Sequence, residues 1–231
     1  MENIKVEHLL VKDFQVSESI KSIRTNLMFC GEDVRVLALT SVSPAEGKSS
    51  VAFQLAGSLA QAGKKTLLID ADLRKGTLLN YLHVRGKIDG LTNYLADADD
   101  IKSVIFTTDV SKFSVMFSGA RSINSSELLG SNTFKRTIEK LREDFDYIIV
   151  DSAPLGQVVD TAVIAPVVDG VLMVIDATQN SYKAERRIKK QIELAGGKVL
   201  GAILNRVDYG SKSFYGKSYG KYYGEYENIE E

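Results

Sequence analysis

Short apolar runs separated by amphipathic stretches are the main pattern of this chain. Six runs have the length and the β-branched content of buried parallel strands. They lie at residues 34–40, 66–69, 113–117, 147–150, 170–175 and 199–204. Apolar residues recur at helical spacing between runs, over 49–62, 133–145 and 183–194. This alternation predicts an α/β fold with a doubly wound, mostly parallel sheet, in which ligands bind beyond the carboxyl ends of the strands.

The two ends of the chain differ from this pattern. Residues 17–29 have apolar positions at helical spacing and predict an amphipathic helix before the first strand. After Asn205 the periodicity gives way to a stretch rich in Gly, Ser, Lys and Tyr. We therefore expect one folded domain over residues 1–207 and a flexible tail over 208–231.

Composition narrows the function classes. The chain has 231 residues and a formal net charge of −1, which gives no overall basic field for nucleic acid or anionic membranes. No apolar run approaches the roughly 20 residues of a membrane span, and no secretory signal is recognisable, so we expect a cytoplasmic protein. One Cys and two His cannot form an internal disulfide or a His/Cys zinc site. The chain has ten Tyr and no Trp, and six of the Tyr lie in the tail.

A phosphate-binding loop is predicted directly after the first strand. Gly47, Lys48 and Ser49 stand at a strand-to-helix turn, where backbone N–H groups face phosphates, the lysine reaches the terminal phosphates and the serine faces Mg²⁺. Val42 occupies the position of the early glycine in the general motif, so a turn without a nucleotide role stays an alternative. The expected nucleotide-binding residues are Pro44, Ala45, Glu46, Gly47, Lys48, Ser49 and Ser50.

Three carboxylates follow two other strands. Asp70 and Asp72 end one apolar run, and alternation along an extended chain would place them on the same side. Two such close charges are unfavourable unless a cation or a proton lies between them, although a helix N-cap would account for one of them. Asp151 ends another run and has the place of a carboxylate that acts on Mg²⁺ directly or through water. With Ser49, these residues predict a nucleotide and Mg²⁺ site.

The segments TSVSPAEGKSS, LLIDADLR and YIIVDSAP, together with the preceding helix and the Tyr-rich end, resemble the bacterial tyrosine kinases of capsular and extracellular polysaccharide synthesis. The resemblance implies a P-loop fold of the type found in septum-site and partition ATPases. It also implies ATP and Mg²⁺ as cofactors and four catalytic residues. Lys48 would neutralise the transferred phosphoryl group, Asp70 would accept the tyrosine proton, and Asp72 and Asp151 would hold Mg²⁺ with Ser49.

By the same resemblance, the tail supplies the phosphoacceptors. A Gly-spaced, flexible segment can enter a cleft in an extended form, and repeated acceptors raise the local concentration of substrate. An aggregation-prone aromatic tail is the alternative. The predicted acceptors are Tyr215, Tyr219, Tyr222, Tyr223 and Tyr226.

Further residues have roles that the resemblance suggests. In the family, a charged helix mediates contacts in a ring, which points to Glu18, Lys21 and Arg24, although a solvated helix face explains these charges equally well. The middle position of the family pattern is Arg, and Lys21 lacks the planar fork. Asn205 and Arg206 correspond to residues near the base in related ATPases. Arg74 would contact phosphate or a neighbouring subunit, or would simply be a surface residue.

The resemblance also implies partners. A membrane polysaccharide co-polymerase would supply an activating cytoplasmic segment and recruit the chain to the inner face of the plasma membrane. The unphosphorylated chain would form a homo-oligomeric ring, and a protein tyrosine phosphatase would reverse the modification. No nucleic acid is expected.

Two other functions remain open. A septum-site or partition ATPase switch would carry a second lysine five residues before Lys48, where this chain has Ser43, and would lack the tyrosine cluster. A non-catalytic nucleotide-binding regulator would not need the intact carboxylates.

Overall fold

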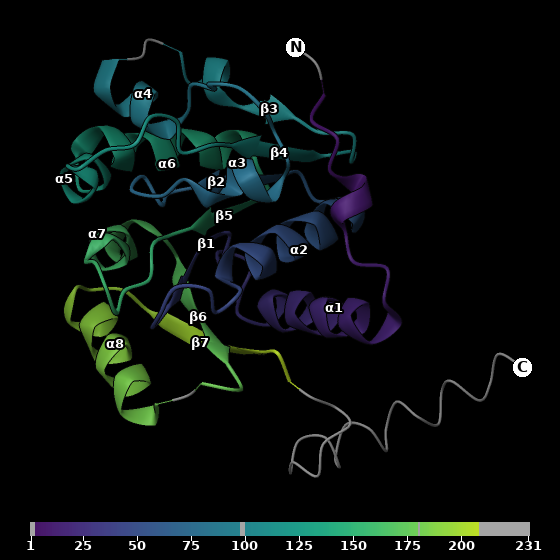
Figure 1. The fold of residues 1–231 in the computed structure, drawn as a ribbon, viewed down its shortest axis with the longest axis vertical. Helices are drawn as coiled ribbons and strands as arrows, with labels where there is room; N and C mark the ends of the chain where they lie inside the picture. Colours follow the sequence, from purple (N-terminus) through teal and green to yellow (C-terminus); the bar gives the residue numbers. More distant parts are fainter. Residues whose placement is uncertain (1–2, 98–99, 180, 208–231) are drawn as a thin grey trace, which may run out of the picture.

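The computed structural model describes residues 3–97, 100–179 and 181–207, and the strands of this part of the chain form one sheet. The strands are β1 (Val36–Ser41), β2 (Thr66–Asp70), β3 (Phe106–Thr107), β4 (Phe113–Met116), β5 (Tyr147–Asp151), β6 (Gly170–Asp176) and β7 (Val199–Asn205). Their order is β3-β4-β2-β5-β1-β6-β7 (Figure 1). β3 pairs with β4 antiparallel, and the other pairs are parallel. The six predicted strands and the mostly parallel sheet are confirmed.

The helices follow the strands in the expected alternation. They are α1 (Phe14–Met28), α2 (Lys48–Gln61), α3 (Thr77–Tyr81), α4 (Leu91–Asp97), α5 (Ser125–Leu129), α6 (Asn132–Asp144), α7 (Asp160–Ile164) and α8 (Tyr182–Leu194), with 3-10 turns η1 (Glu7–Leu9), η2 (Ile101–Val104) and η3 (Ala165–Val167). Sequence periodicity predicts α1, α2, α6 and α8. It misses α3, α4, α5 and α7 because five to seven residues make too few turns to establish a period.

Helices cover both faces of the sheet (Figure 1). On one face, buried residues of α1, α2 and α3 pack against the strands around Phe53 and Phe113, whose ring centroids lie 5.7 Å apart. On the other face, α4 to α8 contribute a second cluster that includes Phe134 and Ile188. The two clusters bury the central strands β1, β2, β5 and β6 from both sides, so these strands read as continuous apolar runs instead of alternating ones. The prediction of a buried strand is wrong for β7, which lies at the edge of the sheet and buries only Ile203.

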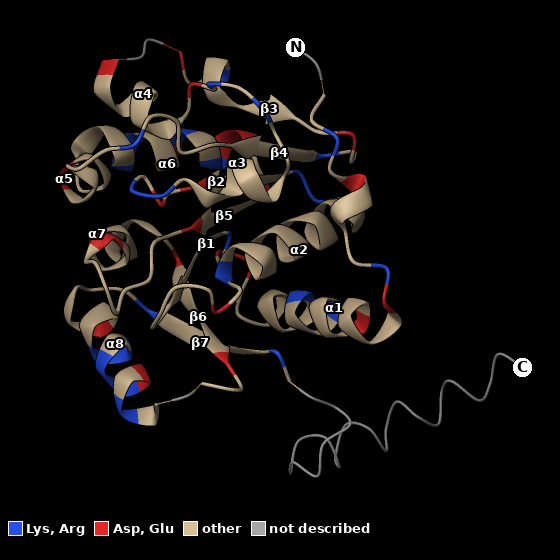
Figure 2. Cartoon of the chain, in the orientation of Figure 1, with Lys and Arg blue, Asp and Glu red and all other residues tan. Residues whose placement is uncertain are grey.

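Three of the four long helices, α1, α6 and α8, begin at side-chain caps. The Ser131 Oγ accepts the N–H of Phe134 at the start of α6 at 3.1 Å, and the Ser181 Oγ does the same for Ala184 at the start of α8. α8 buries Ile188, whereas its Lys and Arg residues, coloured blue along the helix in Figure 2, are exposed. Because only one face of α8 is buried, its apolar residues recur at helical spacing.

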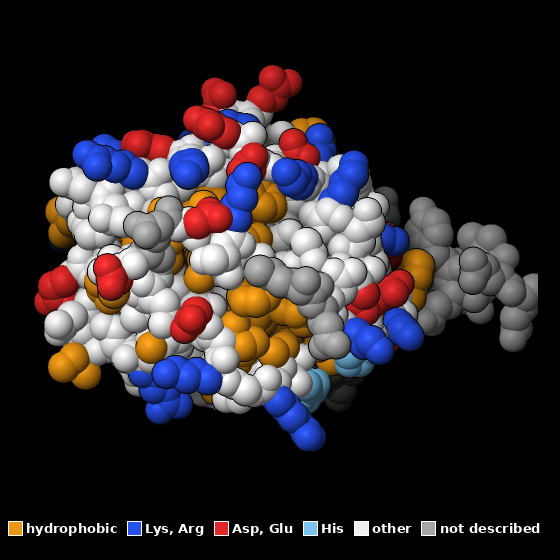
Figure 3. Space-filling view, turned by 90° about the horizontal axis from the view of Figure 1, so that it is seen from above, with side chains coloured by type: hydrophobic (Ala, Val, Ile, Leu, Met, Phe, Trp, Pro, Cys, Tyr) orange, Lys and Arg blue, Asp and Glu red, His pale blue; other side chains and the backbone are white. Residues whose placement is uncertain are grey.

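Charges of both signs are mixed on the described surface. On the face at the β3 end of the molecule, positive and negative side chains stand next to one another around an apolar area (Figure 3). Among the helices of the described ranges, none has the length and apolar character that a membrane span requires.

Strand register brings the predicted site residues to one edge. In the pairing of β2 with β5, Asp70 is the partner of Asp151, and in the pairing of β1 with β5, Leu39 is the partner of Asp151. The carboxyl ends of these three central strands therefore meet. The loop that begins after β1 joins them at the same edge.

Candidate active site

The loop between β1 and α2 folds around a buried carboxylate. The Glu46 Oε2 accepts the N–H of Val42 at 3.0 Å, and burial raises the pKa of Glu46 above its ordinary value even though backbone N–H groups oppose this. Gly47 has φ of 85°, a left-handed conformation that glycine adopts without strain. The loop thus delivers its last residues to the N-terminus of α2, where free N–H groups attract anions.

Asn205 and Arg206 hold this loop in place. The Asn205 Nδ2 donates to the Glu46 carbonyl at 2.9 Å, and the Arg206 Nη2 donates to the Ala45 carbonyl at 2.8 Å. Arg206 also pairs with the buried Asp176 at 2.6 Å. Both residues are therefore close to the loop, and Arg206 lines the adjoining cavity. Their contact with a base stays a prediction.

Lys48 and Asp151 form a buried ion pair. The Lys48 Nζ lies 2.5 Å from the Asp151 Oδ1, with 7% of the lysine side chain exposed and none of the aspartate. The other oxygen of Asp151, Oδ2, is buried and has no hydrogen-bond partner among the described residues. An unsatisfied carboxylate oxygen in the interior is unfavourable. It is a ready ligand for a cation.

Asp70 and Asp72 have different surroundings, although the sequence pattern treats them alike. The fully buried Asp70 accepts the N–H of Asp72 at 3.1 Å and that of Leu78 at 3.2 Å. Burial, followed by the nearby charge of Asp151, raises the pKa of Asp70 to about 8. β2 ends at Asp70, so strand alternation does not extend to Asp72. Asp72 lines the cavity, whereas Asp70 is fully buried and does not belong to its lining.

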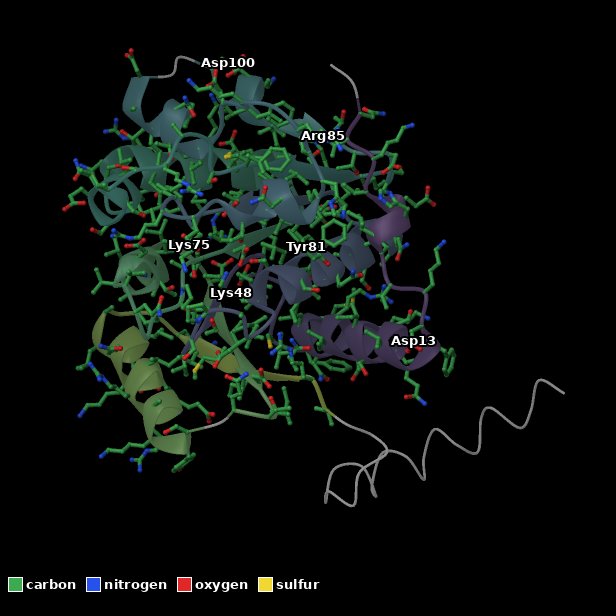
Figure 4. The ribbon with its side chains drawn as sticks, in the orientation of Figure 1. Asp13, Lys48, Lys75, Tyr81, Arg85 and Asp100 are labelled. Carbon is green, nitrogen blue, oxygen red and sulfur yellow. The ribbon has the colours of Figure 1, made fainter. Side chains whose placement is uncertain are left out.

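A cavity of about 460 Å³ opens at this edge of the sheet. Lys48, Lys75 and Tyr81 lie around it, and they come from α2, the loop after β2 and α3 (Figure 4). Its lining includes Ser41, Pro44, Ala45, Glu46, Gly47, Lys48, Ser49, Ser50, Asp72, Lys75, Thr77, Tyr81, Pro154 and Arg206. Every residue predicted for nucleotide binding except Asn205 contributes to this lining.

α3 adds residues that sequence reasoning missed. The Ser49 Oγ lies 3.3 Å from the Thr77 Oγ1, and the Ser50 Oγ lies 3.1 Å from the Tyr81 hydroxyl. Thr77 and Tyr81 are four residues apart and so face the same side of one helical turn. A five-residue helix carries no other signal that would have pointed to the cavity.

The residues at this edge fit a Mg²⁺ ion that is shared with phosphates. No group of three or more His, Cys, Asp or Glu within the described ranges could hold a metal by itself. Mg²⁺ commonly uses only one or two carboxylates together with substrate phosphates and water. Ser49, Asp72 and Asp151 would hold it here, and the unpartnered Oδ2 of Asp151 supplies the physical reason.

The charged residues of α1 are engaged within the chain. The Lys21 Nζ lies 2.6 Å from Glu18, and the Arg24 Nη1 donates to the Ser58 carbonyl at 2.9 Å and to its Oγ at 3.1 Å. Arg24 therefore ties α1 to α2, while Glu18 and Lys21 pair on the outer side. Their role in subunit contacts stays a prediction. The predicted acceptor tyrosines lie outside the described residues.

Arg74 does not point to solvent as a free cation. Its guanidinium binds both oxygens of Asp160 at 3.0 Å. The hydrogen bonds of Arg74 thus run to another element of the same chain, and neither interpretation drawn from the sequence described this pairing.

Comparison with known proteins gives a consistent result. Residues 34–199 match the family described as AAA domain. A tyrosine-protein kinase CpsD of Streptococcus agalactiae is 42% identical over 208 residues, which are 88% of this chain and 91% of the relative. The crystal structure of the chimerical protein CapA2B2 has a TM-score of 0.80 at 32% identity and covers 87% of this chain and 89% of that one.

The fold extends to a wider group of ATPases. The cell-division ATPase MinD of Pyrococcus furiosus has a TM-score of 0.62 at 23% identity, over 76% of this chain and 74% of its own. At that identity the likeness is one of fold alone. The P-loop, the three strand-end carboxylates and the close relatives together place the chain in the AAA-domain family and, within it, among the bacterial tyrosine-protein kinases of the CpsD and CapB type.

Proposed function

We propose that the chain transfers the terminal phosphoryl group of ATP to tyrosines of its own C-terminal segment and thereby regulates capsular or extracellular polysaccharide synthesis. The observation that carries the proposal is the convergence of Lys48, Asp70, Asp72 and Asp151 at the carboxyl ends of β1, β2 and β5. The sequence of the tail provides the second half, because six tyrosines fall between residues 209 and 226.

The chain's own residues would divide the work of binding. Gly47 and the first turn of α2 direct backbone N–H groups at the phosphates, and Lys48 would exchange Asp151 for a phosphate oxygen. That exchange leaves both oxygens of Asp151 available at the edge where Ser49 and Asp72 lie. Mg²⁺ neutralises phosphate charge when bound there. Catalysis beyond this is largely a matter of in-line positioning.

We assign to Asp70 the role of accepting the proton of the tyrosine hydroxyl. In the reaction, the tyrosine oxygen forms a bond to phosphorus, the bridging oxygen of the nucleotide leaves, and the hydroxyl proton goes to a carboxylate. A tyrosine has a pKa of about 10 and gains from such a base near neutral pH. With its pKa raised to about 8, Asp70 is a stronger base once ionised but is mostly protonated at neutral pH, so this role requires that it first loses its proton. Its complete burial also requires that the surrounding residues open as the tyrosine enters.

Partners follow from the family. A separate membrane co-polymerase would supply an activating cytoplasmic segment, and a tyrosine phosphatase would restore the unmodified tail. Recruitment to the membrane through such a partner fits a chain in whose described part no helix can span a bilayer. An ATPase switch, which shares this fold, remains the competing function and would hydrolyse ATP without labelling the tail.

The decisive test is incubation of the full chain with ATP and Mg²⁺, with and without the co-polymerase's cytoplasmic segment, followed by mass mapping. We expect phosphotyrosine among the tail positions in the wild type and none in Lys48→Met. Because Lys48→Met leaves Asp151 without its cation, Ser49→Ala serves as a second variant that keeps the ion pair. ATP hydrolysis without tail phosphotyrosine under both conditions would contradict the proposal and favour the ATPase switch.

A further inference from the structure

The first residue of α7 connects two parts of the site. Asp160 is fully buried, and both of its oxygens accept hydrogen bonds from Arg74, Oδ2 from Nε and Oδ1 from Nη2, each at 3.0 Å. The Ser125 Oγ donates to the same Oδ2 at 2.8 Å. Arg74 stands two residues after Asp72. Asp160 therefore anchors the loop that carries Asp72.

The second residue of α7 connects the other side. The Thr161 Oγ1 donates to the Ala153 carbonyl at 2.8 Å and lies 2.7 Å from the Ser152 Oγ. It also lies 3.0 Å from the Thr40 Oγ1 in β1. Ser152 directly follows Asp151. Thr161 therefore anchors both the segment after Asp151 and the strand that leads to the phosphate loop.

The backbone ladder between β2 and β5 ends just before Asp72. The ladder between β2 and β5 ends where Asp70 is paired with Asp151, and the last bond runs from the Ala71 N–H to the Asp151 carbonyl at 2.8 Å. Asp72 lies beyond that bond. The bond at Ala71 and the Asp70 side chain, which accepts the N–H of Asp72, hold Asp72 from one side. Two neighbouring residues of α7 add a side-chain connection between the loop after Asp72 and the segment after Asp151.

We propose that Asp160 and Thr161 are positioning residues that fix the separation of Asp72 and Asp151, the two carboxylates that would share Mg²⁺. The inference rests on the proposed function, because it concerns the metal of that reaction. A planar guanidinium bound at two oxygens sets direction as well as distance, which a lysine cannot do. Groups that orient metal ligands in this way change metal affinity about 10- to 100-fold when they are altered.

The test measures binding of ADP to the full chain by calorimetry, once with Mg²⁺ and once with EDTA. The ratio of the two affinities reports how well the carboxylates hold the metal, without any need for turnover. For Arg74→Lys and Thr161→Val we expect that ratio to fall about tenfold or more, with ADP affinity in EDTA unchanged. Thr161→Ser keeps the hydroxyl and should keep the wild-type ratio. In the kinase assay, the half-saturating Mg²⁺ concentration should rise by a similar factor.

Arg142→Lys is the matched control. Arg142 also binds both oxygens of an aspartate, Asp169, but at the opposite end of the strands. The Arg142→Lys variant should have a lower melting temperature, but its ratio of ADP affinities with Mg²⁺ and with EDTA should equal that of the wild type. If Arg74→Lys and Thr161→Val keep the wild-type ratio of ADP affinities, the inference is wrong. It is also wrong if the ratio falls equally in Arg142→Lys, because the effect would then come from a general destabilisation of the fold. If the wild type itself binds ADP no more tightly with Mg²⁺, the proposed function fails instead.

Discussion

At the scale of residues, the site depends on how charges are balanced before any substrate arrives. Lys48 is the cation closest to Asp151, and the neighbouring Asp70 has a pKa raised to about 8 by burial and by the charge of Asp151. Removing one partner of a buried ion pair leaves an uncompensated charge, which costs about 3–5 kcal/mol. Lys48 therefore has two roles: it stabilises the fold, and it would also stabilise a bound phosphate.

This predicts a strong coupling between Lys48 and Asp151 in the absence of nucleotide. Lys48→Met should lower the free energy of unfolding by about 3 kcal/mol or more, because it strands the Asp151 carboxylate. Lys48→Met combined with Asp151→Asn should recover much of that loss, as measured by urea unfolding in a double-mutant cycle. Additive effects of the two changes would show that the pair does not contribute as described.

At the scale of elements, one ion pair joins α6 to the strands β1 and β6 at the amino end of the sheet. Asp169, just before β6, accepts the N–H groups of Arg35 and Val36 at 2.9 and 2.7 Å and binds Arg142 of α6. Burial alone would raise the pKa of Asp169, but the hydrogen bonds from Arg142 and the backbone outweigh it and hold the pKa below its ordinary value.

A pH dependence follows from that lowered pKa. The folded carboxylate stays ionised at pH values where the unfolded one, with an ordinary pKa of about 3.8, binds a proton. The stabilisation is thus complete above about pH 4 and is lost as the pH falls through the folded value. Arg142→Ala should be less stable than the wild type by about 1–2 kcal/mol at pH 7 and by less below pH 4. The urea midpoints of the wild type and Arg142→Ala at pH 7 and below pH 4 test this prediction. A stability difference between the two proteins that does not change with pH would contradict it.

At the scale of the whole molecule, the proposed phosphorylation of the tail would change a nearly neutral chain into an anionic one. The formal net charge is −1, and each phosphate adds about 1.5 to 2 negative charges. Several phosphates on one segment would repel one another and the carboxylates of the cleft. Phosphorylation should therefore release the tail from any cleft that binds it.

We expect the unphosphorylated chain to form a larger assembly than the phosphorylated one. Light scattering on both forms measures this, and a variant with all six tail tyrosines changed to phenylalanine should stay in the larger state after incubation with ATP. If the phosphorylated form and the phenylalanine variant have the same mass, the link between modification and assembly is wrong. Glu18→Ala then tests whether α1 contributes to the assembly, since Arg24 already binds Ser58 within the chain.

Six of the seven strands in the described part of the chain and the four long helices could be predicted from the sequence, together with the residue types at the candidate site, whereas the two-residue β3 could not. Buried parallel strands require continuous apolar runs, and a phosphate loop requires Gly47, Lys48 and Ser49 at one turn, so both features are local and visible in the chain. How the surroundings of the carboxylates differ depends on the tertiary structure. Asp70 and Asp72 look equivalent in sequence. Because β2 ends at Asp70, however, Asp70 stays buried at the strand end, whereas Asp72 lines the cavity.

The same holds for Arg74 and α7. Asp160 lies 86 positions from Arg74, and no periodicity or spacing links them, because the contact exists only once β2 and β5 are paired. A helix of five residues has too few turns to show a pattern, and its importance comes from the strand ends that it joins. The residue types of the candidate site could be predicted from short sequence motifs. Their relative positions depend on contacts between residues that lie far apart in the chain.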